Sequence, residues 1–174
     1  MPLSPSQRLD SFDDLLLYRL SRLLSVAGST VVRLCEGTYG ITRREWRIIG
    51  LLHGHEGMTP SALAERVQLD RARTSRTISA LVTKKLIERT PAPGDRRGAR
   101  LALTEAGRRL YEELMPQVVG INNQLLEVLQ EEEVQRLDEL LDRLHQRSLL
   151  LSGALHSELP KANRHLGRRA RGRA

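Results

Sequence analysis

The sequence has little cysteine, few aromatic residues and no long apolar run, and each shortage excludes a class of protein. Its single cysteine, Cys35, cannot form an internal disulfide, and a four-cysteine structural zinc site is excluded as well. No apolar run approaches the ~20 residues that span a bilayer, and residues 1–10 lack the basic and apolar pattern of a signal peptide. We therefore expect a cytoplasmic protein that is stabilised by packing.

The aromatic residues number only five: one Trp, three Tyr and one Phe. The core must therefore consist of Leu, Val, Ile and Ala, most of which suit helices. A hydrophobic fraction of 40% with 28% charged residues is typical of a globular protein, and 174 residues suffice for one domain with helical extensions. The composition thus predicts a mainly α protein.

Positive charge is concentrated in the middle of the chain. Residues 66–100 contain ten basic and three acidic residues, whereas residues 1–65 contain seven of each and residues 101–151 contain twice as many acidic as basic residues. A local positive patch on an otherwise neutral or acidic body favours a polyanionic partner, above all nucleic acid. The alternative is a solvated charged face.

A helix-turn-helix is predicted in this basic region. Thr59 followed by Pro60 is typical of a helix start, and Asp70 after a short turn can cap a second helix. The first two turns of that helix, residues 71–77, are polar and cationic, while apolar residues lie on one side further on. Such a second helix enters the major groove of double-stranded DNA.

A β-hairpin comes next, with strands expected at residues 86–90 and 101–104. Residues 91–99 between them carry Pro, Gly and the charged cluster Asp95, Arg96 and Arg97, so we expect a projecting charged loop that reaches phosphates or a narrow minor groove. Residues 42–104 are therefore interpreted as a winged helix-turn-helix.

Long amphipathic helices flank this unit. A capping box of Ser11 and Asp14 predicts a first helix over residues 11–36, and a second box, Thr42 with Glu45, opens a helix that carries Trp46. Thr104 caps a helix that Pro116 should kink, and another helix follows the acidic run at residues 131–133. We interpret residues 10–41 and 105–151 as a helical dimerisation region of a homodimer, and residues 152–174 as a basic, disordered tail.

The segment LDRARTSRTISALVTKKLIERTPAPGDRRGARLALTEAG, residues 69–107, resembles the MarR family of bacterial transcriptional regulators, as does EWRIIGLLHGHEGMTPSALAERV, residues 45–67. The resemblance implies a dimer on a pseudo-palindromic operator and repression that a small molecule relieves. It also implies a recognition helix over residues 71–85 and a wing arginine in the minor groove. The predicted DNA-binding residues are Thr59, Ser61, Arg71, Arg73, Thr74, Ser75, Arg76, Thr77, Arg96 and Arg97.

An effector site is predicted where the first helix, the Trp46 helix and the helix with Pro116 should enclose an apolar crevice. The resemblance places an anion anchor at Arg19, and an aromatic carboxylate such as a hydroxybenzoate or hydroxynicotinate would suit a guanidinium among rings. The alternative is an interface ion pair and ordinary core aromatics. The predicted ligand-binding residues are Arg19, Tyr18, Tyr39, Trp46 and Tyr111.

Other signals have plainer explanations. Cys35 fits a small buried residue better than a redox sensor, and His53, His55 and Glu56 fit a surface turn better than a metal site. Arg100 either contacts DNA or pairs with Asp95 or Glu88. We expect no metal, no cofactor and no enzymatic activity, because catalytic motifs are absent from the sequence. The alternatives to a repressor are an activator, a sequence-unselective architectural DNA-binding protein, a protein-binding winged helix and a small-molecule enzyme.

Overall fold

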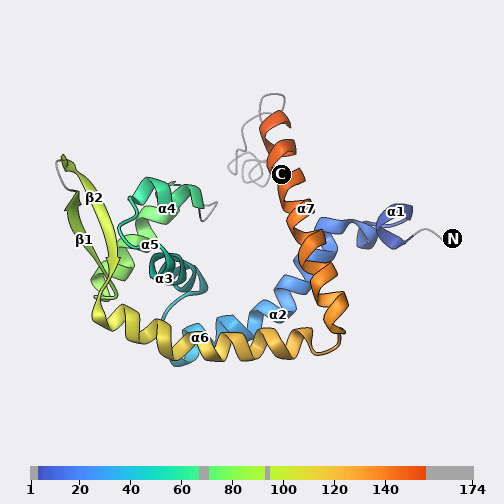
Figure 1. Cartoon of the computed structure of the whole chain (residues 1–174), viewed down its shortest axis with the longest axis horizontal. Coiled ribbons are helices and arrows are strands. Elements are labelled where there is room, and N and C mark those ends of the chain that lie inside the picture. Colours follow the sequence, from blue (N-terminus) through green and yellow to red (C-terminus); the bar gives the residue numbers. More distant parts are fainter. Residues whose placement is uncertain (1–3, 67–70, 93–94, 156–174) are drawn as a thin grey trace, which may run out of the picture. The chain divides into compact units, whose positions relative to one another are not determined.

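The computed structural model describes residues 4–66, 71–92 and 95–155. The chain divides into two compact units, residues 1–125 and 126–174. The predicted mainly α fold with one hairpin is confirmed (Figure 1). In chain order the elements are α1 (Pro5–Arg8), the short 3-10 helix η1 (Phe12–Asp14), α2 (Leu16–Thr38), α3 (Arg43–Gly54), α4 (Pro60–Arg66), α5 (Arg71–Thr83), β1 (Ile87–Ala92), β2 (Asp95–Leu103), α6 (Glu105–Leu126) and α7 (Glu131–Leu155).

The first long helix begins later than predicted. The Ser11 N–H donates to Asp14 Oδ2 at 2.9 Å, but this box closes η1 and not the long helix. Leu15 then has extended backbone angles, φ −62° and ψ 123°, which separate η1 from α2. The pairing of Ser11 with Asp14 was therefore a correct sign of a helical turn and a wrong sign of where the long helix starts.

The other predicted helix starts agree with the structure. At α3, the Thr42 N–H donates to Glu45 Oε2 at 2.6 Å, and the Glu45 N–H donates to Thr42 Oγ1 at 3.2 Å. At α4, the Ala62 N–H donates to Thr59 Oγ1 at 3.2 Å. Each bond satisfies an N–H that the helix itself leaves without a partner. Asp70, the predicted cap of α5, lies outside the described residues.

The hairpin is longer than predicted, and the loop correspondingly shorter. β1 and β2 pair antiparallel from Ile87 opposite Leu103 to Pro91 opposite Ala99, and a register shift follows between Pro91 and Ala92. Most of the expected loop, residues 91–99, is therefore strand. Pro91 is tolerated because a two-stranded hairpin consists of edge strands, where a missing N–H matters little.

One hydrophobic core joins the winged helix-turn-helix to the long helices of the first unit. Figure 1 shows the hairpin beside α4 and α5, with α3 next to them. The core takes side chains from α2, α3, α4, α5, the hairpin and α6, so the position of α2 and α6 affects the packing of the helix-turn-helix and the hairpin. Its fully buried members include Cys35, Ile48, Ile49, Leu52, Leu63, Ile78, Leu81, Ile87, Leu101, Leu103 and Leu114.

The helices after the hairpin begin as predicted. The Gly107 N–H donates to Thr104 Oγ1 at 3.1 Å, and α6 continues through Pro116 as one helix. In the second unit, three glutamates occupy the first turn of α7, where the helix dipole favours negative charge. None of the helices in the described ranges is both long enough and apolar enough to cross a membrane.

Candidate nucleic-acid interface and the adjoining pocket

The helix α5 has one buried face and one exposed cationic face. Ile78 and Leu81 are fully buried, whereas Arg71, Ser75 and Arg76 are exposed. Buried residues recur at helical spacing, so the exposed residues gather on the opposite side. Arg76 Nε donates to Ala72 O at 3.3 Å, about one turn earlier on the same helix.

Three predicted contacts on α5 lie closer to the protein interior. Thr74 is only 1% exposed and shares the buried face with Ile78 and Leu81, so it presents no surface to a ligand. Arg73 and Thr77 are half-buried, and Thr77 Oγ1 donates to Arg73 O at 3.0 Å. The spacing of residues 74, 78 and 81 in the sequence is the signal that could have identified Thr74 as an inward residue.

The remaining predicted contacts lie at α4 and on the wing. Thr59 and Ser61 are exposed at the start of α4, where Thr59 caps the helix. Arg96 and Arg97 lie on β2, and their side chains, like that of Asp95, fall outside the part that the structure describes. The wing arginines are therefore placed by their backbone alone.

Arg100 connects the wing to the loop before α4. Its Nη1 donates to Gly57 O at 2.8 Å. The Gly57 N–H donates to Leu101 O at 3.0 Å, and the Leu101 N–H donates to Met58 O at 2.9 Å. These bonds fix the base of the hairpin against the α3–α4 loop. Arg100 thus has a structural partner in Gly57, while the side chain of Asp95, one of its two predicted partners, lies outside the described part of the chain.

The five residues predicted to bind a ligand fall into two groups. Trp46 and Tyr111 stack with ring centroids 5.4 Å apart, and Tyr39 Oη accepts a hydrogen bond from Gln117 on α6. Tyr18 instead packs on Phe12, with centroids 4.5 Å apart, and Arg19 Nη1 donates to Ser6 Oγ at 2.7 Å. Tyr18 and Arg19 thus contact the chain before α2, whereas Trp46 and Tyr39 contact α6.

The predicted crevice between the first helix, the Trp46 helix and α6 is present. It measures about 380 Å³. Each helix contributes a stripe of residues three or four apart, so the lining is one face of each helix. Trp46 is the one predicted ligand residue in this lining. The lining residues are Leu24, Ala27, Gly28, Val31, Arg43, Trp46, Arg47, Val118, Ile121, Asn122 and Leu125.

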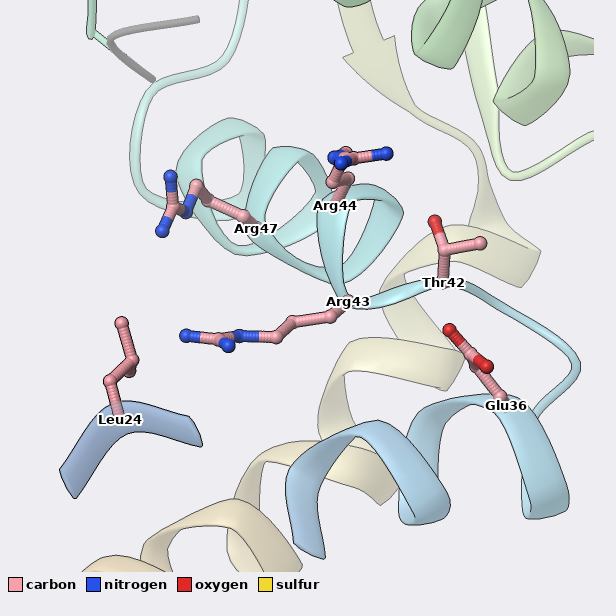
Figure 2. Close-up of a pocket in the computed structure, with 6 residues that line it drawn as sticks. All are labelled: Leu24, Glu36, Thr42, Arg43, Arg44 and Arg47. Carbon is pink, nitrogen blue, oxygen red and sulfur yellow. The ribbon is translucent and has the colours of Figure 1, made fainter. Parts of the chain in front are cut away.

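A second, cationic pocket adjoins the crevice, and we call it the arginine pocket (Figure 2). It measures about 450 Å³ and is lined by Leu24, Glu36, Thr42, Arg43, Arg44 and Arg47. Figure 2 shows the Arg43 side chain extending from α3 toward Leu24 of α2. Both pockets share Leu24, Arg43 and Arg47.

The charges of the arginine pocket favour an anion. Its arginines lie in the first turns of α3, at the end where the helix dipole is already positive. Guanidinium groups bind carboxylates through paired N–H donors. Sequence reasoning did not select Arg43 and Arg47 as ligand-binding residues. The signal that could have identified them is their spacing around Trp46, which puts all three residues on one face of a helix predicted to begin at Thr42.

Cys35 and the histidines have structural surroundings. Cys35 is fully buried, and burial, followed by the negative charge of Glu36, raises the pKa of its thiol. His53 stacks on Tyr111 with centroids 3.8 Å apart. Among the residues that the structure describes, no three His, Cys, Asp or Glu side chains gather as metal ligands would.

The order of elements defines the class of protein. A short helix α4, the longer helix α5 and a two-stranded wing form a winged helix-turn-helix.

Comparison with known proteins finds similarity to one family of transcriptional regulators. Residues 39–98 match the model of the MarR family. The HTH-type transcriptional regulator MhqR of Bacillus subtilis is 28% identical over 107 residues, which cover 61% of this chain and 73% of MhqR. The multiple antibiotic resistance protein MarR of Escherichia coli is 28% identical over 130 residues, which cover 72% of this chain and 90% of MarR.

Solved structures agree with these matches. A MarR/EmrR family transcriptional regulator from Acinetobacter sp. ADP1 is 29% identical, with a TM-score of 0.73 over 79% of this chain and 97% of that one. A cysteine mutant of E. coli MarR in complex with operator DNA is 27% identical, with a TM-score of 0.64 over 78% of this chain and 98% of that one. In sequence and in fold, the chain is thus similar to MarR family regulators.

Proposed function

We propose that the protein is a homodimeric, DNA-binding transcriptional regulator that represses from a pseudo-palindromic operator and is released by a small aromatic acid. The exposed cationic face of α5 carries this proposal, because Arg71, Ser75 and Arg76 face outward while the opposite side of the helix is anchored in the core. The E. coli relative that was solved with operator DNA supports a DNA partner.

The proposed DNA-binding surface comprises the outward residues of α5, the start of α4 and the wing. Exposed arginine contributes both phosphate contacts and bidentate contacts to guanine. Arg73 and Thr77 stay in the proposed set as half-buried residues at the edge of the exposed face, and Thr74 leaves it. The remaining members are Thr59, Ser61, Arg71, Ser75, Arg76, Arg96 and Arg97.

Dimer formation is supported by apolar side chains that the single chain leaves exposed. In the first unit Phe12, Leu17 and Val26 are 67%, 79% and 75% exposed. Large apolar residues in such numbers near one helix mark an interaction site. We propose that the regions 10–41 and 105–151 pair with a second copy, as the two-fold symmetry of a pseudo-palindrome requires.

The DNA-binding proposal is tested with a duplex that the wild-type protein itself selects from a random library. Replacing Arg76 by Ala removes a base or phosphate contact, so we expect affinity for the selected duplex to fall about 5- to 150-fold, the equivalent of ~1 to 3 kcal/mol. The exposed Arg109→Ala on α6 removes the same charge and is the control. Gel-shift titration measures both.

Two results would contradict the proposal. One is that the wild-type protein selects no common sequence, and the other is that Arg76→Ala and Arg109→Ala bind alike. Salt gives a further check: if a dimer neutralises ~6 to 10 phosphates, affinity should drop by ~10³ to 10⁵ between 50 and 200 mM salt.

An effector site is proposed at the crevice and the arginine pocket together. An aromatic ring would lie in the crevice against Trp46, near Tyr111 and Tyr39, and the carboxylate would pair with Arg43 or Arg47. These arginines take the place of Arg19 in the proposal, because Arg19 binds Ser6 and neither Arg19 nor Tyr18 lines the crevice. Suppose that the ligand binds the state unable to bind DNA more tightly, by ~1 to 3 kcal/mol, than it binds the DNA-binding state. The affinity of the protein for DNA then falls by the same factor, because coupling between two sites is reciprocal.

Trp46 reports on this site, because it is the sole tryptophan of the sequence and lines the crevice. Titration with 4-hydroxybenzoate, salicylate or 6-hydroxynicotinate should change its fluorescence, and Arg43→Gln should weaken the response at least tenfold. The neutral amide of the same acid is the control ligand. An equal response to acid and amide, or none to any acid, contradicts the proposed site.

The main alternative function is an architectural DNA-binding protein without sequence preference. The charge of residues 66–100 favours any duplex, whereas the polar start of α5 favours a particular sequence. Competition with unrelated DNA at fixed salt separates the two functions, because a regulator stays bound to its selected duplex in a large excess of unrelated DNA, whereas an architectural protein does not. Promoter fusions separate a repressor from an activator.

A further inference from the structure

We propose that Lys84 is a positioning residue for DNA binding, which holds the recognition helix α5 at the angle that its base contacts need. The inference rests on the proposed function. Lys84 follows the last residue of α5 and lies at the end of the helix opposite Arg71. Its role is therefore to orient the helix and not to contact DNA.

Lys84 connects α5 to the start of α3. Its Nζ donates to Glu45 Oε2 at 2.8 Å and to Gly40 O at 2.8 Å. Glu45 Oε2 also accepts the Thr42 N–H that closes the capping box of α3. One ammonium group thus binds the turn between α2 and α3 and the cap of α3 at the same time, across 39 to 44 residues of sequence.

The bonds of Lys84 to Glu45 and Gly40 restrain the orientation of α5 more closely than its apolar contacts do. Glu45 is only 3% exposed, and a buried carboxylate is costly unless donors surround it. Ile78 and Leu81 hold α5 to the core by apolar contacts, which do not depend strongly on direction. The two hydrogen bonds of Lys84 do depend on direction, and so they restrain the tilt of the helix.

Small changes of tilt matter at the far end of α5. The helix has 13 residues and is therefore about 20 Å long at 1.5 Å per residue. A tilt of roughly 3° at Lys84 moves the first turn by about 1 Å, which is large compared with the tolerance of a hydrogen bond. Bonds to bases require this accuracy, whereas attraction to the charged backbone does not.

The experiment compares Lys84→Met with Lys85→Gln, because both remove one positive charge and the Lys85 side chain is exposed. Binding is measured to the duplex that the wild-type protein selects and to an unrelated duplex of equal length. We expect Lys84→Met to bind the selected duplex about 3- to 30-fold more weakly than Lys85→Gln does, and the unrelated duplex equally well. The dependence on salt should have the same slope in both variants.

A double-mutant cycle ties the effect to Glu45. Glu45→Gln keeps an oxygen for the capping box but removes the charge that Lys84 binds. In the Glu45→Gln background, Lys84→Met should lower affinity for the selected duplex less than threefold, because the partner of Lys84 is already changed. Equal losses in the two backgrounds would overturn the proposal, since Lys84 would then act independently of Glu45.

Further outcomes separate this proposal from the function on which it rests. If the wild-type protein selects no sequence, both fail. If it selects one and Lys84→Met matches Lys85→Gln on both duplexes, or lowers the salt slope by about one as a lost phosphate contact would, only the positioning role fails. Should Lys84→Met not fold, Lys84→Arg replaces it, because arginine keeps the charge but moves the hydrogen-bond donors. This variant should bind the selected duplex more weakly than the wild type does and should bind unrelated DNA equally well. Equal binding of the selected duplex by the variant and the wild type overturns the proposal.

Discussion

Gly107 lies where α6 passes directly against the end of α5. A Cβ atom built at this position would be 2.0 Å from Leu86 O, a backbone atom that has no rotamer with which to move aside. The Thr104 N–H donates to the same oxygen at 3.1 Å, which holds it in place. The close approach of these two segments therefore requires glycine.

Replacing Gly107 by Ala should lower the free energy of unfolding by about 3 kcal/mol, because a packed backbone has to shift. Gly120→Ala in the same helix meets nothing within 4 Å and should raise it by about 0.5 to 1 kcal/mol through helix propensity. Urea unfolding measures both variants. Similar values for the two would show that the approach at residue 107 is looser than 2.0 Å implies.

Cys35 is a second residue whose surroundings determine its chemistry. Burial raises the pKa of the thiol, so the unfolded chain loses this proton at lower pH than the folded chain does. The stabilisation from the protonated thiol is complete below the ordinary cysteine pKa of about 8.5 and is lost as pH rises toward the raised value. A buried, protonated thiol is also a poor nucleophile.

We therefore expect the stability advantage of the wild type over Cys35→Ala to shrink between pH 8 and pH 10. Measuring the difference between the two proteins at each pH cancels groups that titrate in both. Iodoacetamide should modify Cys35 slowly in the folded protein and rapidly in denaturant. Rapid modification under native conditions would restore the redox-sensor interpretation.

The boundaries of the helices show how far local sequence patterns reach. Thr42, Thr59 and Thr104 marked helix starts correctly, because a cap depends only on neighbours within about three residues. The strands were underestimated, because pairing with the opposite strand and not local composition kept residues 91–92 and 95–99 in the hairpin. Ser11 satisfied the same local rule as Thr42 but closed only a single turn.

The end of α5 is strained at Lys85, whose φ is +57°. The left-handed conformation suits glycine and costs other residues roughly 1 to 2 kcal/mol. It allows the Leu86 N–H to reach Leu81 O at 3.0 Å and closes the helix, and Thr104 Oγ1 donates to Lys85 O at 2.7 Å.

Lys85→Gly should therefore raise the free energy of unfolding by about 1 kcal/mol, after the greater flexibility of glycine in the unfolded chain is subtracted. Lys85→Ala is the matched control, since it removes the same side chain but keeps the strain. Thermal unfolding followed by circular dichroism compares the two. A gain for both variants would attribute the effect to the lysine side chain rather than to its backbone.

At the scale of the whole molecule, the exposed apolar side chains of α2 remain the main feature that one chain does not explain. Leu17→Glu places a charge on the 79% exposed position and should weaken a dimer by at least tenfold in dissociation constant. Thr90→Glu adds the same charge on the exposed hairpin and is the control. Sedimentation velocity over a dilution series reports the state. A wild-type chain that stays monomeric at micromolar concentration contradicts the dimer.

For the candidate site, too, the sequence predicted which residues share one helix but not which helices contact one another. The polar face of α5 could be predicted because its residues are neighbours on one helix. The ligand-binding prediction chose aromatic residues by type. The structure separated Tyr18 and Arg19 from Trp46, because these two residues contact Phe12 and Ser6 and do not line the crevice. Arg43 and Arg47 could be placed on one face with Trp46, but not against Leu24 and Val31 of another helix.

Sequence alone determined the helical composition, most of the caps and the polar, cationic start of α5, since each depends on residue type and short spacing. Tertiary structure alone decided that two pockets share Arg43 and that Lys84 reaches Glu45. Those contacts join segments far apart in the chain, and their geometry follows from how helices pack against one another, which no local pattern specifies.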